Sequence, residues 1–313
     1  MNELLIGIEA ARWFDPHKPC ESMKYVSERG IEALDLSFSY VFSPDGYKEG
    51  KKYDLPYLPD EDFIKSFSEM KAASEKYGVK IAQAHAPYPT YFEDDPVLTE
   101  LGIMTVEKLI GACAYLGCDQ LIVHPHEDPW HPHQNYKWNI INIEMFSRFI
   151  PAAKKYGVKI CLENLLCVEN DEIIGGICSS VEETCYLIDS LNEIAGADVF
   201  GFCFDVGHLN ASGLDVYSFI KGVGSRISAL HLHDNDGRSD AHLFPYTQIR
   251  DQWGLQAGVN WEDVIKGLRE INYRGCLSFE TFRAFYHFPR EVWDEAIALN
   301  LAIGKYMRKR ILE

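Results

Sequence analysis

The stretch VFGFCFD at residues 199–205 alternates aromatic side chains with small or acidic ones. Side chains along a β-strand point alternately to its two faces, so Gly201, Cys203 and Asp205 share one face and the three phenylalanines share the other. Bulky apolar residues on one face suit a strand covered by helices, and small residues on the other suit the narrow interior of a barrel. The stretch therefore predicts a barrel strand that carries a carboxylate at its inner carboxyl end.

Three further stretches repeat this arrangement. They are VKICLEN (158–164), RISALHLH (226–233) and GCLSFET (275–281). In each of them one polar residue follows smaller residues on the same face, namely Glu163, His231 and Glu280. Because the carboxyl ends of parallel strands meet at one mouth of a barrel, we expect these side chains to converge with Asp205.

Eight strands are predicted in all, and amphipathic segments such as residues 60–78 and 262–275 lie between them as helices. The strands are expected at residues 4–9, 31–37, 79–85, 119–125, 158–164, 199–205, 226–233 and 275–281. Alternating strands and helices over 313 residues fit a (β/α)8 TIM barrel, which typically needs about 250 residues plus insertions. No low-complexity linker divides the chain, so we predict a single α/β domain over residues 1–313.

The hexapeptide KYGVKI occurs twice, at residues 76–81 and 155–160. In both copies we expect a helix to end, the glycine to adopt the left-handed conformation, and a buried strand to begin. The repeat supports the length of the β-α units.

The composition excludes several classes of partner. The chain has 30 Lys and Arg against 47 Asp and Glu, a formal net charge of −17, which argues against sequence-independent binding to nucleic acid and against docking on anionic membranes. It contains no run of 18 apolar residues and begins without a basic leader, so we expect a cytoplasmic protein. Its nine cysteines include no CxxC pair, which indicates free thiols in a reducing compartment.

A metal ion is predicted at the mouth of the barrel. Three carboxylates and one imidazole would be unfavourable to bury without a partner, and together they suit an octahedral divalent cation. We predict one ion held by Glu163, Asp205, His231 and Glu280, with Mn²⁺ as the first choice and Mg²⁺, Co²⁺ or Zn²⁺ as alternatives.

Other polar residues follow the same strands. His85 and His124 end the third and fourth strands, His208 follows Asp205 by three residues, and the run HLHDNDGRSDAHL supplies further candidates after the seventh strand. Those candidates are His233, Asp234, Arg238, Asp240 and His242. From the whole group we predict that His85, His124, His208, Arg238 and His242 bind the substrate.

Three connections that follow predicted strands are long, at residues 38–59, 125–137 and 234–259. In a barrel they lie on the face where ligands bind. The segment 125–138, which includes the middle connection, brings His126, His131 and His133 together with Trp130, Tyr136 and Trp138. We expect it to be a lid over the substrate, where one histidine would serve as an extra acid or base, or a surface for a second subunit, either another copy or a partner. A solvated surface tract is the simpler interpretation.

Six motifs carry a resemblance to a known group of barrels. They are HAPY (85–88), the strand end at Glu163, FDVGH (204–208), HLHDND (231–236), DAHL (240–243) and LSFE (277–280). Through them the chain resembles, over essentially its whole length, the xylose isomerase-like superfamily, which includes sugar isomerases and epimerases and endonuclease IV. The resemblance implies that Glu163, Asp205, His231 and Glu280 hold one Mn²⁺-like ion and that His208 contacts a substrate oxygen. Glu169 matches a second glutamate of the tagatose epimerase-like members, and we predict that it also binds the substrate by holding its hydroxyl groups.

The predicted function is a metal-dependent sugar isomerase or epimerase that acts on a ketose or related polyol ketone through a cis-enediolate. Glu163 and Glu280 would be the catalytic residues, because they can take and return a proton on the two faces of the substrate. A lyase with the same metal chemistry, either a dehydratase or a C-glycoside deglycosidase subunit, is an alternative. An endonuclease IV-like phosphodiesterase with three zinc ions is another, since His85, His124, His208, Asp240 and His242 match its additional ligands, although the net charge counts against it. A sugar-binding barrel without activity is a further alternative.

Overall fold

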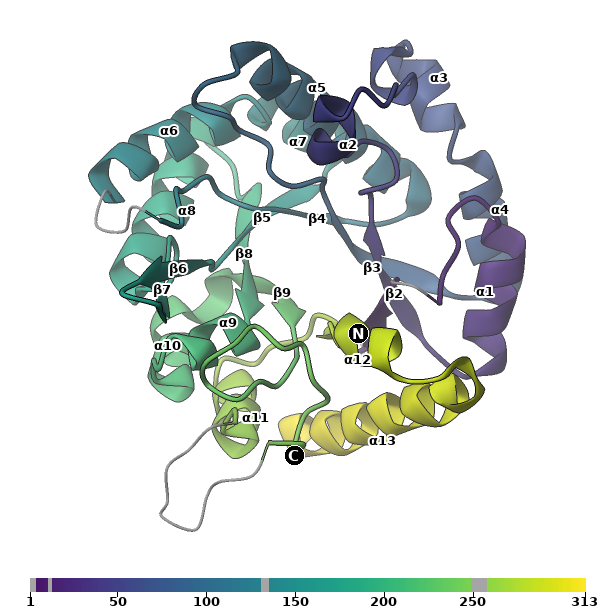
Figure 1. Cartoon of the computed structure of the whole chain (residues 1–313), viewed down its shortest axis with the longest axis vertical. Coiled ribbons are helices and arrows are strands. Elements are labelled where there is room, and N and C mark those ends of the chain that lie inside the picture. Colours follow the sequence, from purple (N-terminus) through teal and green to yellow (C-terminus); the bar gives the residue numbers. More distant parts are fainter. Residues whose placement is uncertain (1–3, 11–12, 131–134, 249–257) are drawn as a thin grey trace.

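Eight parallel strands form a barrel in the computed structural model, which describes residues 4–10, 13–130, 135–248 and 258–313 (Figure 1). The strands are β1 (Ile6–Glu9), β2 (Ala33–Ser37), β3 (Lys80–His85), β4 (Gln120–Val123), β5 (Lys159–Glu163), β8 (Phe200–Asp205), β9 (Ile227–His231) and β10 (Leu277–Phe279). Their order around the sheet is β10-β1-β2-β3-β4-β5-β8-β9. Each of them falls within a predicted strand, so the predicted TIM barrel is confirmed.

A short seam between β9 and β10 closes the barrel. The Leu232 N–H donates to the Ser278 carbonyl at 2.8 Å, and the Glu280 N–H donates to the Leu232 carbonyl at 3.1 Å. These two bonds form an isolated bridge between Leu232 and Phe279 at the carboxyl ends of the strands. The last strand pair therefore joins beside the residues predicted to bind the ion.

Helices surround the barrel (Figure 1). They are α1 (Pro19–Glu28), α2 (Pro44–Lys48), α3 (Asp60–Lys65), α4 (Ser68–Tyr77), α5 (Pro96–Leu116), α6 (Asn135–Ser147), α7 (Ile150–Tyr156), α8 (Val181–Ala195), α9 (Val206–Ala211), α10 (Val216–Val223), α11 (Trp261–Glu270), α12 (Phe282–His287) and α13 (Trp293–Leu312), with 3-10 turns at Leu55–Tyr57, Gly224–Arg226 and Arg290–Val292. None of the described helices is long and apolar enough to cross a membrane.

Two predicted helices are shorter than expected. The segment 60–78 divides into α3 and α4, because the Ser66 hydroxyl donates to the Phe63 carbonyl at 2.6 Å and Phe67 turns into the core. The segment 262–275 is helical only to Glu270, since Asn272 has a φ of 57° and ends the helical path.

The two faces of the strands differ as predicted. Phe200, Phe202 and Phe204 belong to the large core between the barrel and its helices. Inside the barrel, Cys161, Cys203 and Ala229 pack with Ile122 in a separate small cluster. This packing confirms which face of these strands points inward.

The two copies of KYGVKI also adopt the predicted conformation. Gly78 and Gly157 both have a φ of 68°, each directly after a helix, and each is followed within two residues by a strand. Glycine adopts this left-handed conformation without the steric penalty of a side chain.

An antiparallel hairpin that was not predicted follows β5. It consists of β6 (Leu166–Glu169) and β7 (Glu172–Gly175), and Asn170 and Asp171 turn the chain with φ values of 52° and 64°. Glu127, in the loop after β4, anchors its base by accepting a hydrogen bond from the Ile177 N–H at 2.6 Å.

Candidate metal centre

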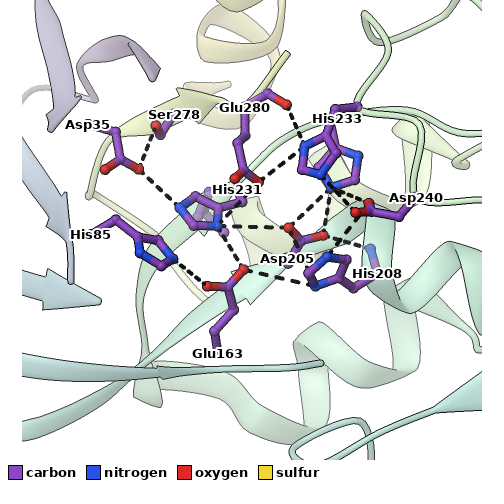
Figure 2. Close-up of polar contacts among 12 residues, drawn as sticks. Asp35, His85, Glu163, Asp205, His208, His231, His233, Asp240, Ser278 and Glu280 are labelled. Carbon is purple, nitrogen blue, oxygen red and sulfur yellow. Dashed lines mark hydrogen bonds and ion pairs between the residues drawn. The ribbon is translucent and has the colours of Figure 1, made fainter. Parts of the chain in front are cut away.

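Four side chains from the ends of β5, β8, β9 and β10 converge on one point (Figure 2). Nδ1 of His231 lies 2.9 Å from Oε1 of Glu163, 3.5 Å from Oε2 of Glu280 and 3.8 Å from Oδ2 of Asp205. One donor atom from each of the four residues lies within 4.8 Å of every other. The structure thus brings together all four predicted metal ligands, which will be called the central cluster.

The donors of the central cluster fit a divalent ion. Oε2 of Glu280 is buried and has no hydrogen-bond partner among the described residues. Burial, although opposed by His231, raises the pKa of Glu280 well above its ordinary value, and the nearby carboxylates add to this effect. Three buried carboxylates around one imidazole are therefore short of positive charge, which a bound cation would supply.

A second group of donors lies beside Glu163. Its Oε2 atom is 3.0 Å from Nε2 of His124 and 3.5 Å from Nε2 of His85. The two histidine Nε2 atoms are 2.9 Å apart, so one of them donates and the other accepts. His85 and His124 therefore reach the site, as predicted, and share Glu163 with the central cluster.

A third group lies on the side of Asp205. His208, His233, Asp240 and His242 each offer one donor atom within 4.8 Å of the others. Nε2 of His242 is 2.9 Å from Oδ2 of Asp240, and Nε2 of His233 is 3.0 Å from Oδ1 of Asp205. Burial alone would lower the pKa of His208, but Asp205 and Asp240 raise it to about 10. This group could hold a cation of its own.

Asn164 ties the ends of β5 and β8 together. Its Oδ1 accepts from the Asp205 N–H and its Nδ2 donates to the Asp205 carbonyl, both at 2.8 Å. Asp205 in turn accepts at Oδ1 from the His208 N–H at 2.6 Å and so caps α9. Glu163 and Asp205 are consequently held in fixed relative positions.

Sequence reasoning missed two residues beneath the central cluster. Oδ2 of Asp35 lies 3.0 Å from Nε2 of His231, and Nε2 of Gln83 donates to the same oxygen at 2.6 Å. Both side chains are only 1% exposed. The available signal was an aspartate between two leucines in the buried strand ALDL, since such a carboxylate needs a partner.

The other predicted residues are placed as follows. Arg238 is exposed, and no hydrogen bond or ion pair between its guanidinium and the cluster is found in the described part of the chain, whereas Nη2 of Arg283 is 3.6 Å from Asp240. Glu169 is half-buried at the end of β6. His126 packs between the rings of Tyr91 and Trp138. His131 and His133 lie outside the described residues.

Aromatic rings border the donor groups. The Phe282 ring lies 4.4 Å from that of His242, and the Tyr88 ring lies 4.4 Å from that of His124. Tyr88 is 47% exposed and Phe282 is half-buried, so both rings lie between the donor groups and the surface.

Comparisons with known proteins agree with the fold. A family model described as a xylose isomerase-like TIM barrel matches residues 24–301. An uncharacterized protein, MJ1311, from Methanocaldococcus jannaschii is 26% identical over 277 residues, which span 85% of this chain and 80% of that protein. An inosose isomerase from Halalkalibacterium halodurans is 26% identical over 148 residues, or 46% of this chain and 47% of that enzyme.

Solved structures share the fold over nearly the whole chain. A D-tagatose 3-epimerase-like protein superposes with a TM-score of 0.66 at 20% identity, covering 98% of both chains. The IOLI protein with a bound zinc atom superposes with a TM-score of 0.65 at 15% identity, covering 97% of this chain and 98% of the other.

Proposed function

Since the chain belongs to the family of xylose isomerase-like TIM barrels, we propose that it is a divalent-metal-dependent sugar isomerase or epimerase. Its substrate would be a ketose or a related polyol ketone. The observation that carries the proposal is the central cluster, in which the carboxylates of Glu163 and Glu280 both approach Nδ1 of His231 (Figure 2). The similarity to an inosose isomerase, and the zinc in a protein of the same fold, support it.

Glu163, Asp205, His231 and Glu280 would hold the ion, which when bound would act as a Lewis acid toward the substrate carbonyl. Glu163 would remove the proton from the carbon next to the carbonyl, and Glu280 would return one on the opposite face of the resulting cis-enediolate, or the reverse. His85, His124, His208 and His242 would bind hydroxyl groups. Tyr88 and Phe282 would exclude water from the reacting carbon.

Proton exchange tests this proposal directly. Protein loaded with Mn²⁺ is incubated in D₂O with a panel of ketoses and inososes, and products are followed by NMR. We expect deuterium at the carbon next to the carbonyl together with a new epimer or isomer, and no reaction after the metal has been removed. A product that has lost water would assign a lyase, and no exchange with any panel member would contradict the proposal.

The two outer groups of donors favour one second candidate, a phosphodiesterase with three metal ions. His85 and His124 beside Glu163, and His208, Asp240 and His242 beside Asp205, extend the central cluster on both sides. Elemental analysis of the purified protein separates the candidates: one ion per chain supports the isomerase, and three zinc ions per chain support the phosphodiesterase. Cleavage of a DNA duplex with an abasic site is the matching activity assay.

A further inference from the structure

The two ring nitrogens of His231 face different carboxylates (Figure 2). Nδ1 lies 2.9 Å from Oε1 of Glu163 in the central cluster, and Nε2 lies 3.0 Å from Oδ2 of Asp35. His231 and Asp35 are each 1% exposed, so water does not compete for either contact. An imidazole can bind a metal ion only through a nitrogen that carries no proton, so the partner of the other nitrogen matters.

We propose that Asp35 is a positioning residue that fixes the tautomer of His231. It accepts a hydrogen bond from Nε2–H and thereby leaves Nδ1 as the nitrogen offered to the ion. The inference rests on the metal centre of the proposed function. Carboxylates that orient metal-binding histidines in this way raise the basicity of the ligand and keep its ring in one orientation.

Asp35 is itself held in place by two strands besides its own. Nε2 of Gln83 on β3 donates to Oδ2 of Asp35 at 2.6 Å and to the Leu230 carbonyl at 3.1 Å. Oγ of Ser278 on β10 donates to the same Asp35 oxygen at 3.4 Å. Since Leu230 directly precedes His231, Gln83 links the carboxylate to the main chain that carries the imidazole. These contacts therefore fix the position of the Asp35 carboxylate with respect to both the backbone and the ring of His231.

The direct test reads the ring nitrogens themselves. Protein labelled with ¹⁵N-histidine is loaded with Zn²⁺, which is diamagnetic, and long-range ¹H–¹⁵N spectra are recorded. We expect a proton on Nε2 of His231 and a Zn²⁺ ligand at Nδ1. The opposite arrangement, with the proton on Nδ1, would overturn the proposal even if the protein binds zinc tightly.

Variants give a second readout, the Zn²⁺ dissociation constant measured against a competing chelator. We expect Asp35→Ala to weaken Zn²⁺ binding by about 10- to 100-fold. Asp35→Asn keeps an oxygen that can accept from Nε2–H, so it should retain the tautomer and lose less affinity. Ser74→Ala is the control, because it removes a buried hydroxyl on α4 that donates to the Val79 carbonyl and contacts neither Asp35 nor the central cluster, and its affinity should equal that of the wild type.

The outcomes separate this inference from the proposed function. Wild-type protein that binds no divalent ion would overturn both. Wild-type binding that Asp35→Ala and Asp35→Asn leave unchanged would overturn the role of Asp35 alone. If Asp35→Ala does not fold, Asp35→Asn and the wild-type spectrum still decide the question.

Discussion

Gly207 sets the position of His233 and, through it, the position of Asp205. His233 contacts the two Asp205 oxygens at 3.0 and 3.1 Å and is completely buried. A Cβ atom at position 207 would lie 2.0 Å from Cε1 of His233, well inside van der Waals contact. The absence of a side chain at this position therefore makes room for an imidazole beside a metal ligand.

We expect Gly207→Ala to lower the free energy of unfolding of the metal-free protein by about 1–2 kcal/mol, measured by urea denaturation. Without the clash we would expect no such loss, since alanine has a higher helix propensity than glycine. In the double variant Gly207→Ala/His233→Ala the clash is gone, so the loss should be smaller than the sum of the single losses. Additive losses would show that the two residues do not interact.

The two glutamates of the central cluster can be tested separately. Glu163→Gln and Glu280→Gln should each lower kcat by about 10²- to 10⁴-fold, because each removes a group that transfers a proton. Metal content is measured on the same samples, so that loss of the ion is distinguished from loss of the chemistry. Glu182→Gln, at an exposed position in the first turn of α8, is the control and should retain full activity. Wild-type turnover by either glutamine variant with metal bound would rule out the mechanism.

At the scale of elements, the strands were predictable and the hairpin was not. The four stretches that lead to Glu163, Asp205, His231 and Glu280 alternate small and bulky side chains and end in a polar residue, so the sequence alone indicates which of their side chains point into the barrel. β6 and β7 span four residues each, no more than β1 or β4, but they follow β5 directly with no helical segment between, so the alternation of strands and helices did not mark them. Their pairing depends on Glu127, about 50 residues away, which binds the main chain of Ile177.

The same reasoning explains which parts of the site could be predicted. The four residues of the central cluster lie at strand ends. There the alternation of side chains along the strand is enough to predict which of them point into the barrel. The contact between Asp35 and His231 joins residues 196 positions apart, and it exists only because the barrel closes. Arg238 is exposed, and it lies in a turn in which its N–H donates to the Asp236 side chain. The conformation of that turn could not be predicted from the spacing of residues in the sequence.

Because Glu127 binds the base of the hairpin, we predict that the stability of the protein depends on pH. Burial raises the pKa of Glu127 from its ordinary value of 4.5 to about 7, although the Ile177 N–H opposes this shift. Between about pH 4.5 and pH 7 the Glu127 carboxyl keeps its proton in the folded protein and loses it in the unfolded chain. Its contribution to the free energy of unfolding is therefore fully present below about pH 4.5 and is lost as the pH rises to about 7. Relative to Glu127→Gln, the wild type should lose up to about 3 kcal/mol over this range.

Urea unfolding of both proteins at several pH values between 4 and 8 measures this difference. Glu172→Gln, at an exposed position on the same hairpin, is the control and should follow the wild type. A difference between wild type and Glu127→Gln that does not change with pH would contradict the prediction.

The molecule as a whole carries a net charge of −17 and gathers several buried carboxylates at one mouth of its barrel. A ligand that binds only the folded state stabilises it, by about 2.7 kcal/mol at a concentration 100 times its Kd. We therefore expect saturating Mn²⁺ or Zn²⁺ to raise Tm by about 5 °C or more over protein treated with EDTA. Calorimetry measures the shift, which should be smaller in Glu163→Gln because that variant loses one charged ligand. An equal Tm with and without ions would contradict a metal centre at this site.

The closure between β9 and β10 has a consequence for how an ion would leave. Only two hydrogen bonds form that bridge, and His231 and Glu280 come from the strands on its two sides. An ion held by both residues would link β9 to the end of β10 beside these two hydrogen bonds and make their opening less frequent. The amides of Leu232 and Glu280 should therefore exchange with deuterated solvent more slowly once metal is bound. Exchange followed by mass spectrometry on peptides spanning these amides measures this protection, and equal rates with and without metal would contradict it. The lifetime of the bound ion would then depend on how often the whole barrel opens as well as on the strength of its ligand bonds.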